Sequence, residues 1–434
     1  MSERNIVICS DGTGNTFDKS VSNVTRLVKL LALNDREQQV MVYDQGIGTT
    51  ERVEAIKQFH TSVPDFNTLH VLEAPKTFWA NPAGLVKRLL GLGFGYGLKA
   101  NIRQMYEKLS QLYCPGDKIF LFGFSRGAFT VRALAGLIYH CGLPKLEGAM
   151  AKGCFSEAYA LYSMLYKQRG DEWERIHAIA DERQREAESE KWYHRDKERS
   201  KYDAERVADF HRRFPIHEDV RIHFLGIWDT VKSYGGIRPI MLPHLRHNPR
   251  VKIIRHALAL NERRSWFDAT TWGRLDLDSK GALVRLKETL SSDDYRALEA
   301  QDIEEVWFRG CHSDIGGGDE EAVTGMIALR WMLGEAKSKG LALNEKGETV
   351  LCTDDPAGLA EIHESMSPAW KVAAYAHVKE IDNSGMYPVL KSAVGKTGRR
   401  TPDTLTRDGK ILLHSSVGAH HAILAPVEYR HTKR

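Results

Sequence analysis

Residues Lys118 to Ala128 read KIFLFGFSRGA, and this stretch decides the fold. An apolar run leads directly into the pattern GxSxG, centred on Ser125, and a helix-like segment continues to Ile138. A serine on a tight strand-to-helix turn needs small residues two positions before and after it, and Gly123 and Gly127 meet that need. Because an expected strand and helix flank the motif, it predicts a nucleophile elbow rather than a chance match in a turn.

Strands and helices alternate on both sides of this stretch. Residues Ile6 to Cys9 form an apolar run that suits a parallel strand buried on both faces. Further expected elements are a helix capped by Asn23, a strand Gln39–Tyr43, a helix Lys99–Tyr113, and strands Lys118–Phe122, Arg221–Trp228 and Glu304–Arg309. The alternation predicts an α/β protein of the α/β-hydrolase type, with a mostly parallel sheet flanked by helices and with helical insertions.

The length of 434 residues suits one large core that carries insertions. Hydrophobic residues make up 42% of the chain and charged residues 27%, which is the balance of a globular protein with a sizeable core. We expect the core over residues 1–330 and a C-terminal accessory segment over 331–434, packed on the core. At about 167–213 acids and bases alternate, which favours a solvated helical insertion, and a lid over the site is the alternative.

Charge and cysteine content narrow the class of protein. A net charge of +4 predicts neither a nucleic-acid interface nor a polybasic membrane anchor. The six cysteines are scattered without a CxxC pair, so they are expected as thiols rather than as a disulfide or zinc framework. No apolar run approaches the roughly 18 residues of a spanning helix, and the N-terminal run is too short for a signal peptide. We expect a cytoplasmic protein, while export by a signal-independent secretion system stays open.

A serine hydroxyl needs a histidine base, and that histidine needs an orienting carboxylate. In the expected fold these residues follow each other in the chain as serine, acid, histidine. Asp229 comes directly after the strand that ends at Trp228, and His312 comes just after the next predicted strand. We therefore predict Asp229 as the acid and His312 as the base, with Asp268 and Asp314 as alternative acids.

The negative oxygen of a tetrahedral intermediate needs two hydrogen-bond donors. The first expected donor is the backbone N–H of Arg126, which follows the serine. The second is expected from the loop after the first strand, Asp11-Gly12-Thr13-Gly14, with Gly12 and Thr13 as the two candidates. The alternative is that this loop is a plain glycine turn.

Three other motifs do not predict a cofactor site. Gly395-Lys396-Thr397 lacks the earlier glycine of a phosphate-binding loop, and the run Gly91 to Gly97 lacks a dinucleotide-binding pattern preceded by a strand. His244 and His247 lack the HExxH pattern and are expected as surface histidines. We predict no cofactor and no required metal.

Together these segments resemble the DUF2235 family of α/β-hydrolases, which includes phospholipase effectors of bacterial type VI secretion. The resemblance runs over most of the chain and rests on ICSDGTGN (8–15), GIGT (46–49), GFGYGL (93–98), FLFGFSRGA (120–128), WDTV (228–231), HALALNERR (256–264) and HSDIGGG (312–318). It implies an esterase-like site with Ser125 as nucleophile, His312 as base and an aspartate such as Asp229. It also implies phospholipase activity, and an immunity or secretion partner is compatible with it.

Two classes of function stay open. One is an enzyme that cleaves a phospholipid or another acyl ester, and the other is an interaction protein that keeps the fold to bind partners. The complete set of serine, acid and histidine favours the enzyme. Apolar residues between Leu85 and Phe94, together with Trp192-Tyr193 in the charged insertion, suggest peripheral contact with a lipid surface, and packing on the core is the alternative.

Overall fold

The computed structural model describes residues 3–12, 21–45, 68–72, 94–145, 153–231, 234–235, 238–239, 242–273, 290–318, 323–353, 362–365, 379–382, 389–392, 400, 411–414, 417 and 429–432. Several residues named from the sequence lie outside these ranges. They include residues 13–15, the GIGT segment at 46–49, most of the apolar run that starts at Leu85, the glycines at 91 and 93, and the segment 395–397.

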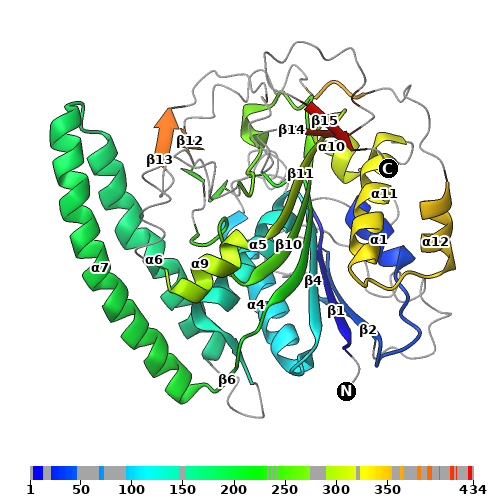
Figure 1. Ribbon diagram of the computed structural model, residues 1–434, viewed down its shortest axis with the longest axis horizontal. Helices are drawn as coiled ribbons and strands as arrows, with labels where there is room; N and C mark the ends of the chain where they lie inside the picture. Colours follow the sequence, from blue (N-terminus) through cyan, green and yellow to red (C-terminus); the bar gives the residue numbers. More distant parts are fainter. Residues whose placement is uncertain are drawn as a thin grey trace, which may run out of the picture.

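One nine-stranded sheet forms the centre of the molecule (Figure 1). Its strand order is β15-β14-β11-β10-β7-β4-β1-β2-β3, and each of these neighbouring pairs runs parallel. The strands are β1 (Asn5–Ser10), β2 (Gln39–Asp44), β3 (Leu69–Leu72), β4 (Lys118–Phe124), β7 (Ile222–Trp228), β10 (Val251–Ala259), β11 (Asp302–Phe308), β14 (Ile411–His414) and β15 (Tyr429–Thr432). The predicted α/β fold of the hydrolase type is confirmed.

Strand β1 shows why this sheet is apolar on both faces. All six of its residues are buried. Ile6 and Ile8 belong to one hydrophobic core, whereas Val7 and Cys9 belong to a second core on the opposite face. Successive side chains of a strand point to opposite faces, so a continuous apolar run is what a sheet covered on both sides requires.

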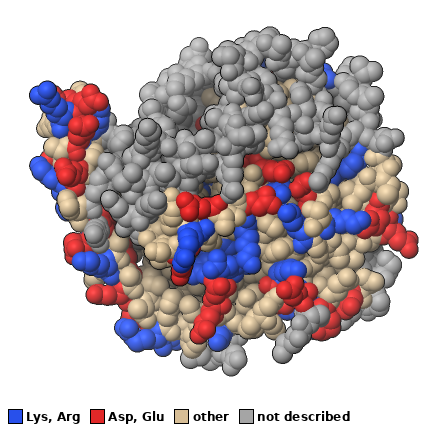
Figure 2. Space-filling view, in the orientation of Figure 1, with Lys and Arg blue, Asp and Glu red and all other residues tan. Residues whose placement is uncertain are grey.

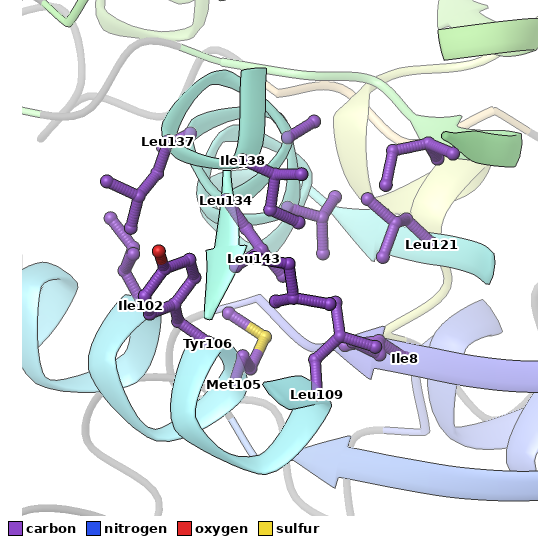
Figure 3. Close-up of a cluster of buried hydrophobic side chains, with 14 of the residues drawn as sticks. Ile8, Ile102, Met105, Tyr106, Leu109, Leu121, Leu134, Leu137, Ile138 and Leu143 are labelled. Atoms are coloured by element: carbon purple, nitrogen blue, oxygen red, sulfur yellow. The ribbon is translucent and has the colours of Figure 1, made fainter. Parts of the chain in front are cut away.

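The first core lies between the sheet and three helices, α4 (Phe94–Leu112), α5 (Arg126–Cys141) and α6 (Cys154–His177). Figure 3 shows Ile8 of β1 and Leu121 of β4 beside Met105 and Leu109 of α4, with Leu134 of α5 above them. Each of these five side chains is fully buried. The α5 helix packs against both β4 and β1, so the turn that starts it is held firmly at the sheet.

The second core lies on the other face, under α1 (Asn23–Leu30), α11 (Val323–Ser338) and α12 (Glu345–Cys352) (Figure 1). The N-cap of α1 is Ser22, one residue before the predicted Asn23, because the Ser22 side chain accepts the hydrogen bond from the N–H of Thr25. Asn23 has a different task. Its amide donates to the backbone oxygens of Ile315 and Gly325, at 2.8 Å each, and thereby ties α1 to α10 (His312–Gly316) and to α11.

The charged insertion is helical, as predicted. Helices α6 and α7 (Glu182–Arg213) form a two-helix arm at one flank of the molecule (Figure 1), and acidic and basic side chains lie side by side along it (Figure 2). Glu172 of α6 accepts from Arg195 and Arg199 of α7, which links the two helices. Trp192 is fully buried. This side chain therefore packs inside the protein, which was the alternative to contact with a lipid surface.

Shorter elements complete the described fold. They are β5 (Leu143–Pro144), β6 (Ile216–His217), β8 (Tyr234–Gly235), β9 (Arg238–Pro239), the 3-10 turn η2 (Ser265–Phe267), α9 (Ser292–Glu299), α10 (His312–Gly316), β12 (Lys379–Asp382) and β13 (Val389–Ser392). None of the described helices is both long enough and apolar enough to cross a lipid bilayer.

The C-terminal part differs from the expected accessory segment. The expected boundary at residue 330 falls inside α11, which covers the sheet. Strands β14 and β15 extend the central sheet beyond β11 in parallel register. Residues beyond 330 therefore contribute directly to the core, because the sheet continues past β11 rather than ending there.

Candidate active site

The site lies where the strand order reverses. From β1 the chain runs to β2 and β3 on one side, and then returns to β4 on the other side of β1. In open parallel sheets, the carboxyl ends of the strands at such a reversal leave a crevice for a ligand. Ser125 follows β4 at this point, and Asp11 follows β1.

Ser125 occupies the turn between β4 and α5 in a strained backbone conformation. Its φ is 58° and its ψ is −117°, and its N–H donates to the backbone oxygen of Trp228 at 3.0 Å. A non-glycine residue in such a region costs on the order of 1–3 kcal/mol, and the surrounding structure must hold it there. The neighbouring β7 supplies part of that restraint, and the turn has the sharp geometry predicted from the GxSxG pattern.

The two glycines of the motif are required by close backbone contacts. A Cβ atom at Gly123 would lie 2.6 Å from the backbone nitrogen of Ala128. A Cβ atom at Gly127 would overlap the carbonyl oxygen of Ser10 and lie 2.6 Å from that of Asp11. Since backbone atoms cannot rotate away, only glycine lets the turn approach the end of β1 so closely.

His312 bridges Ser125 and Asp229 in one hydrogen-bonded chain. Its Nε2 lies 2.7 Å from the Ser125 Oγ, and its Nδ1 lies 2.6 Å from the Asp229 Oδ2. Asp229 follows β7, and His312 begins α10 after β11, so the three side chains come from the ends of three parallel strands. An ionised carboxylate only accepts, so Nδ1–H donates to Asp229 and Nε2 is left to accept the serine hydroxyl.

The imidazole of His312 is enclosed by aromatic rings. The ring centroids of Phe124 and Phe267 lie 4.7 and 4.9 Å from that of His312, the second edge-on. The backbone N–H of His312 donates to Glu262 at 3.1 Å, which fixes the main chain. Burial lowers the pKa of His312, and the Asp229 carboxylate opposes that lowering. The imidazole is therefore neutral near neutral pH and able to accept a proton.

The Asp229 carboxylate is fully buried and receives hydrogen bonds on both oxygens. Oδ1 accepts from the N–H of Ala259 at 2.9 Å and from Arg400, while Oδ2 accepts from His312 and from the second Arg400 nitrogen at 3.0 Å. Burial by itself would raise the pKa of this carboxyl, but Arg400 and His312 outweigh it and hold the pKa well below its ordinary value. No pattern in the sequence marks Arg400, which lies far along the chain from Asp229.

The two alternative acids have other positions. The Asp314 carboxylate accepts from the backbone N–H of Cys311 at 2.8 Å and binds the His363 ring. Asp268 directly follows η2 and is its C-cap. Because Nδ1 of His312 is bound to Asp229, the geometry selects Asp229 among the three aspartates named from the sequence.

The predicted donors for a negative oxygen lie at the start of α5 and after β1. Arg126 is the first residue of α5, and the first N–H groups of a helix make no hydrogen bond to a carbonyl within that helix. The N–H of Gly12 instead donates to the Asp11 side chain at 2.6 Å. Asp11 also accepts from Ser22 at 2.7 Å and Thr25 at 2.8 Å, which holds this loop in place. Thr13, the other candidate, lies outside the described residues.

His244, one of the two histidines set aside in the sequence, contacts other aromatic rings. The His244 ring contacts Tyr139 edge-on, with 4.7 Å between ring centroids, and faces His140 at 6.2 Å. Across the ranges that the structure describes, no three His, Cys, Asp or Glu side chains are grouped so that they could hold a metal ion.

Comparison with known proteins assigns the family. The sequence profile of the catalytic domain of type VI secretion phospholipase effectors, Tle1-like, matches residues 4–335. The chain belongs to this family. The resemblance to type VI phospholipase effectors is thereby confirmed, and Ser125, Asp229 and His312 lie within the matched range. Arg400 lies beyond the matched residues.

Relatives of this Tle1-like chain differ from it in length. An uncharacterized protein of Saccharomyces cerevisiae, YEL023C, is 28% identical over 267 residues, which is 61% of this chain and 32% of the yeast protein. A solved structure of an uncharacterized protein from Pseudomonas aeruginosa has 17% identity and a TM-score of 0.38, and the match covers 81% of this chain and 49% of that one. A structure of the Tle1 effector bound to the VgrG spike has 16% identity and a TM-score of 0.30, with 73% and 51% covered. The chain thus spans about a third to a half of these relatives.

Proposed function

We propose that this protein is a serine hydrolase that cleaves acyl esters, with Ser125 as nucleophile, His312 as base and Asp229 as the orienting acid. The observation that carries the proposal is the unbroken chain of hydrogen bonds from the Ser125 hydroxyl through His312 to Asp229, at 2.7 and 2.6 Å. Membership in a phospholipase effector family supports a hydrolase. A protein that only bound partners would not need this arrangement.

The proposed reaction has two halves. In the first, His312 Nε2 takes the hydroxyl proton as Ser125 Oγ attacks the ester carbonyl, and the backbone N–H of Arg126 donates to the resulting negative oxygen. Collapse expels the alcohol, which receives the proton from His312, and leaves an acyl group on Ser125. In the second half, His312 activates water in the same way, so that the acid is released and the serine is restored.

The buried pair of His312 and Asp229 suits this task. A neutral imidazole can accept the proton, and the nearby anion of Asp229 stabilises the imidazolium that forms in the transition state. Since the Asp229 pKa lies well below its ordinary value, the carboxylate stays ionised throughout the working pH range. The rings of Phe124 and Phe267 pack against the imidazole and limit its rotation.

We propose phospholipids as the substrate class, cleaved at an acyl ester as by a phospholipase A. Family membership supports this choice. The test is to incubate the protein with mixed phospholipid vesicles and, separately, with soluble butyryl esters, and to identify the products by mass spectrometry. Fatty acid with lysophospholipid is the expected result. Cleavage of soluble esters alone would describe a carboxylesterase instead, and release of a phosphorylated head group would contradict acyl-ester chemistry.

Two serine variants separate chemistry from folding in this test. Ser125→Ala should abolish both hydrolysis and labelling by a fluorophosphonate, with an unchanged circular dichroism spectrum. Ser110→Ala is the matched control, because Ser110 is also buried but its hydroxyl donates to the backbone oxygen of Tyr106 within α4. Labelling of Ser125→Ala at full strength would refute the assignment of the nucleophile.

A further inference from the structure

Arg400 reaches the proposed triad from the C-terminal part of the chain. Its Nη1 donates to Oδ1 of Asp229 and to the backbone oxygen of Ala259, the latter at 2.9 Å. Its Nη2 donates to Oδ2 of Asp229 at 3.0 Å and to the backbone oxygen of Phe267. The side chain is buried, with 8% of the residue exposed. One guanidinium therefore joins the acid to the ends of β10 and η2.

Arg400 binds the Asp229 carboxylate in a bidentate manner. A planar guanidinium that meets a carboxylate with two parallel N–H groups fixes the plane of the carboxylate as well as its position. Ala259 and His312 donate to the same two oxygens. With each oxygen accepting two hydrogen bonds, the carboxylate has little freedom to rotate away from His312.

We propose that Arg400 is a positioning residue for catalysis, which locks the Asp229 carboxylate in the plane that His312 requires and moderates the basicity of His312. The proposal rests on the hydrolase function proposed above. It adds a residue that lies 65 positions beyond the end of the matched catalytic-domain profile, which ends at residue 335. The profile therefore does not contain all of the residues that form the site.

The electrostatic part of the proposal follows from the charges around His312. Asp229 and Glu262 favour the protonated imidazole, and Arg264 disfavours it. Arg400 is bound to the same carboxylate as His312, so its positive charge offsets part of the Asp229 anion. His256 also interacts with Asp229, and Glu262 and Asp268 interact with Arg400. Without Arg400, less positive charge would offset the Asp229 carboxylate. The protonated form of His312 would then be more stable.

The kinetic test compares Arg400→Gln with Arg400→Lys. In Arg400→Gln we expect kcat to fall by about 10- to 100-fold from lost orientation, with little change in KM. The acidic limb of kcat/KM should move to higher pH by about half a unit or more, because His312 binds its proton more tightly once the cation is gone. Arg400→Lys keeps the positive charge but loses the planar pair of N–H donors. The acidic limb of kcat/KM should therefore stay near its original pH, while kcat still falls.

Arg255→Gln is the matched control. Arg255 is also a buried arginine that binds carboxylates, those of Asp302 and Glu335, but it lies in the middle of β10 and does not contact Asp229 in the described hydrogen bonds. This change should lower thermal stability without moving the acidic limb. If Arg400→Gln behaved in the same way, with lower stability but an unchanged limb and kcat, Arg400 would be a structural residue and the proposal would be overturned.

A measurement that needs no substrate separates this proposal from the proposed function. Selective labelling of histidine with nitrogen-15 allows the pKa of His312 to be followed by NMR, with His312→Gln to assign the signal. We expect the His312 pKa to rise in Arg400→Gln and to stay in place in Arg255→Gln. An unchanged His312 pKa in folded Arg400→Gln would refute the proposal.

Two other outcomes bear on the proposals separately. A wild-type chain that cleaves no ester would refute the proposed hydrolase function instead. Should Arg400→Gln not fold, wild-type kcat in Arg400→Lys would refute the positioning role.

Discussion

The Nε2 atom of His312 lies 2.7 Å from the Oγ atom of Ser125, although 187 positions separate the two residues in the chain. The parallel sheet produces this contact, because β4 and β11 both end at the same edge and each is followed by a tight turn. Between them in the sheet lie β7 and β10, whose ends carry Asp229 and the segment that contains Glu262. Three strands therefore lead to residues that bind His312, and the fourth, β11, leads to His312 itself.

We predict that Asp229→Asn lowers kcat by on the order of 10⁴-fold, because an amide can hold His312 in the wrong tautomer. The same change removes the anion that Arg400 binds, and breaking a buried ion pair costs about 3–5 kcal/mol of unfolding free energy. Steady-state kinetics and chemical unfolding measure the two effects separately. Asp314→Asn is the comparison, since Asp314 binds Cys311 and His363 rather than the His312 ring.

Asp314→Asn should leave most of the activity, because the hydrogen bond between His312 and Asp229 remains. A loss of kcat in Asp314→Asn equal to that in Asp229→Asn would contradict the choice of acid. An unchanged free energy of unfolding in Asp229→Asn would contradict the strength assigned to its contact with Arg400.

Part of this site can be predicted from the sequence, because its signals lie in short segments at the ends of strands. The GxSxG pattern directly specifies a turn, and β4 and α5 are readable from their apolar spacing. Asp229 and His312 can be found because parallel strands present their carboxyl ends at one edge, so the residues after the strands are candidates. The sequence nevertheless offers Asp268 and Asp314 as alternatives to Asp229 for the proposed acid. Only the three-dimensional contacts distinguish the three aspartates.

The remaining features depend on contacts between distant segments. Strand β10 contains Arg255 and His256, which interrupt the apolar pattern expected of a buried strand. Both are buried, because Glu335 pairs with Arg255 and Glu305 binds His256. Strand β14 has only four residues and belongs to the sheet through its pairing with β11. Arg400 is recognisable only once Asp229 is in place, since no spacing rule links residues 171 positions apart.

The pKa of His312 leads to a pH prediction. Burial lowers this pKa, so the imidazole becomes protonated, and inactive as a base, only at a pH below the ordinary histidine value of about 6.5. We therefore expect the acidic limb of kcat/KM to be centred below that value, and activity to be complete above it. Asp229 makes no contribution to this limb, because its own pKa lies much lower. A profile of kcat/KM against pH measures the limb.

Phe267→Ala provides the comparison for the pH profile. Removing this ring exposes the imidazole edge, so the pKa of His312 should return toward its ordinary value and the acidic limb should move to higher pH. The backbone oxygen of Phe267 that accepts from Arg400 is retained in this variant. A wild-type limb centred above pH of about 7, or a shift to lower pH in Phe267→Ala, would contradict burial as the main cause.

The last prediction concerns the close approach of the elbow to β1. In Gly127→Ala the new methyl group would overlap the carbonyl oxygen of Ser10, which cannot move without displacing β1. Overpacking of this kind costs about 1–3 kcal/mol of unfolding free energy, and the shift of the turn should also lower kcat. Gly334→Ala is the control, because a methyl group there meets its nearest atom, on Leu351, at 3.9 Å. Alanine in the middle of α11 should stabilise the helix by up to about 1 kcal/mol and leave kcat unchanged. Equal thermal stability of the two variants would show that the elbow can relax, and would contradict the view that the motif requires glycine for this contact.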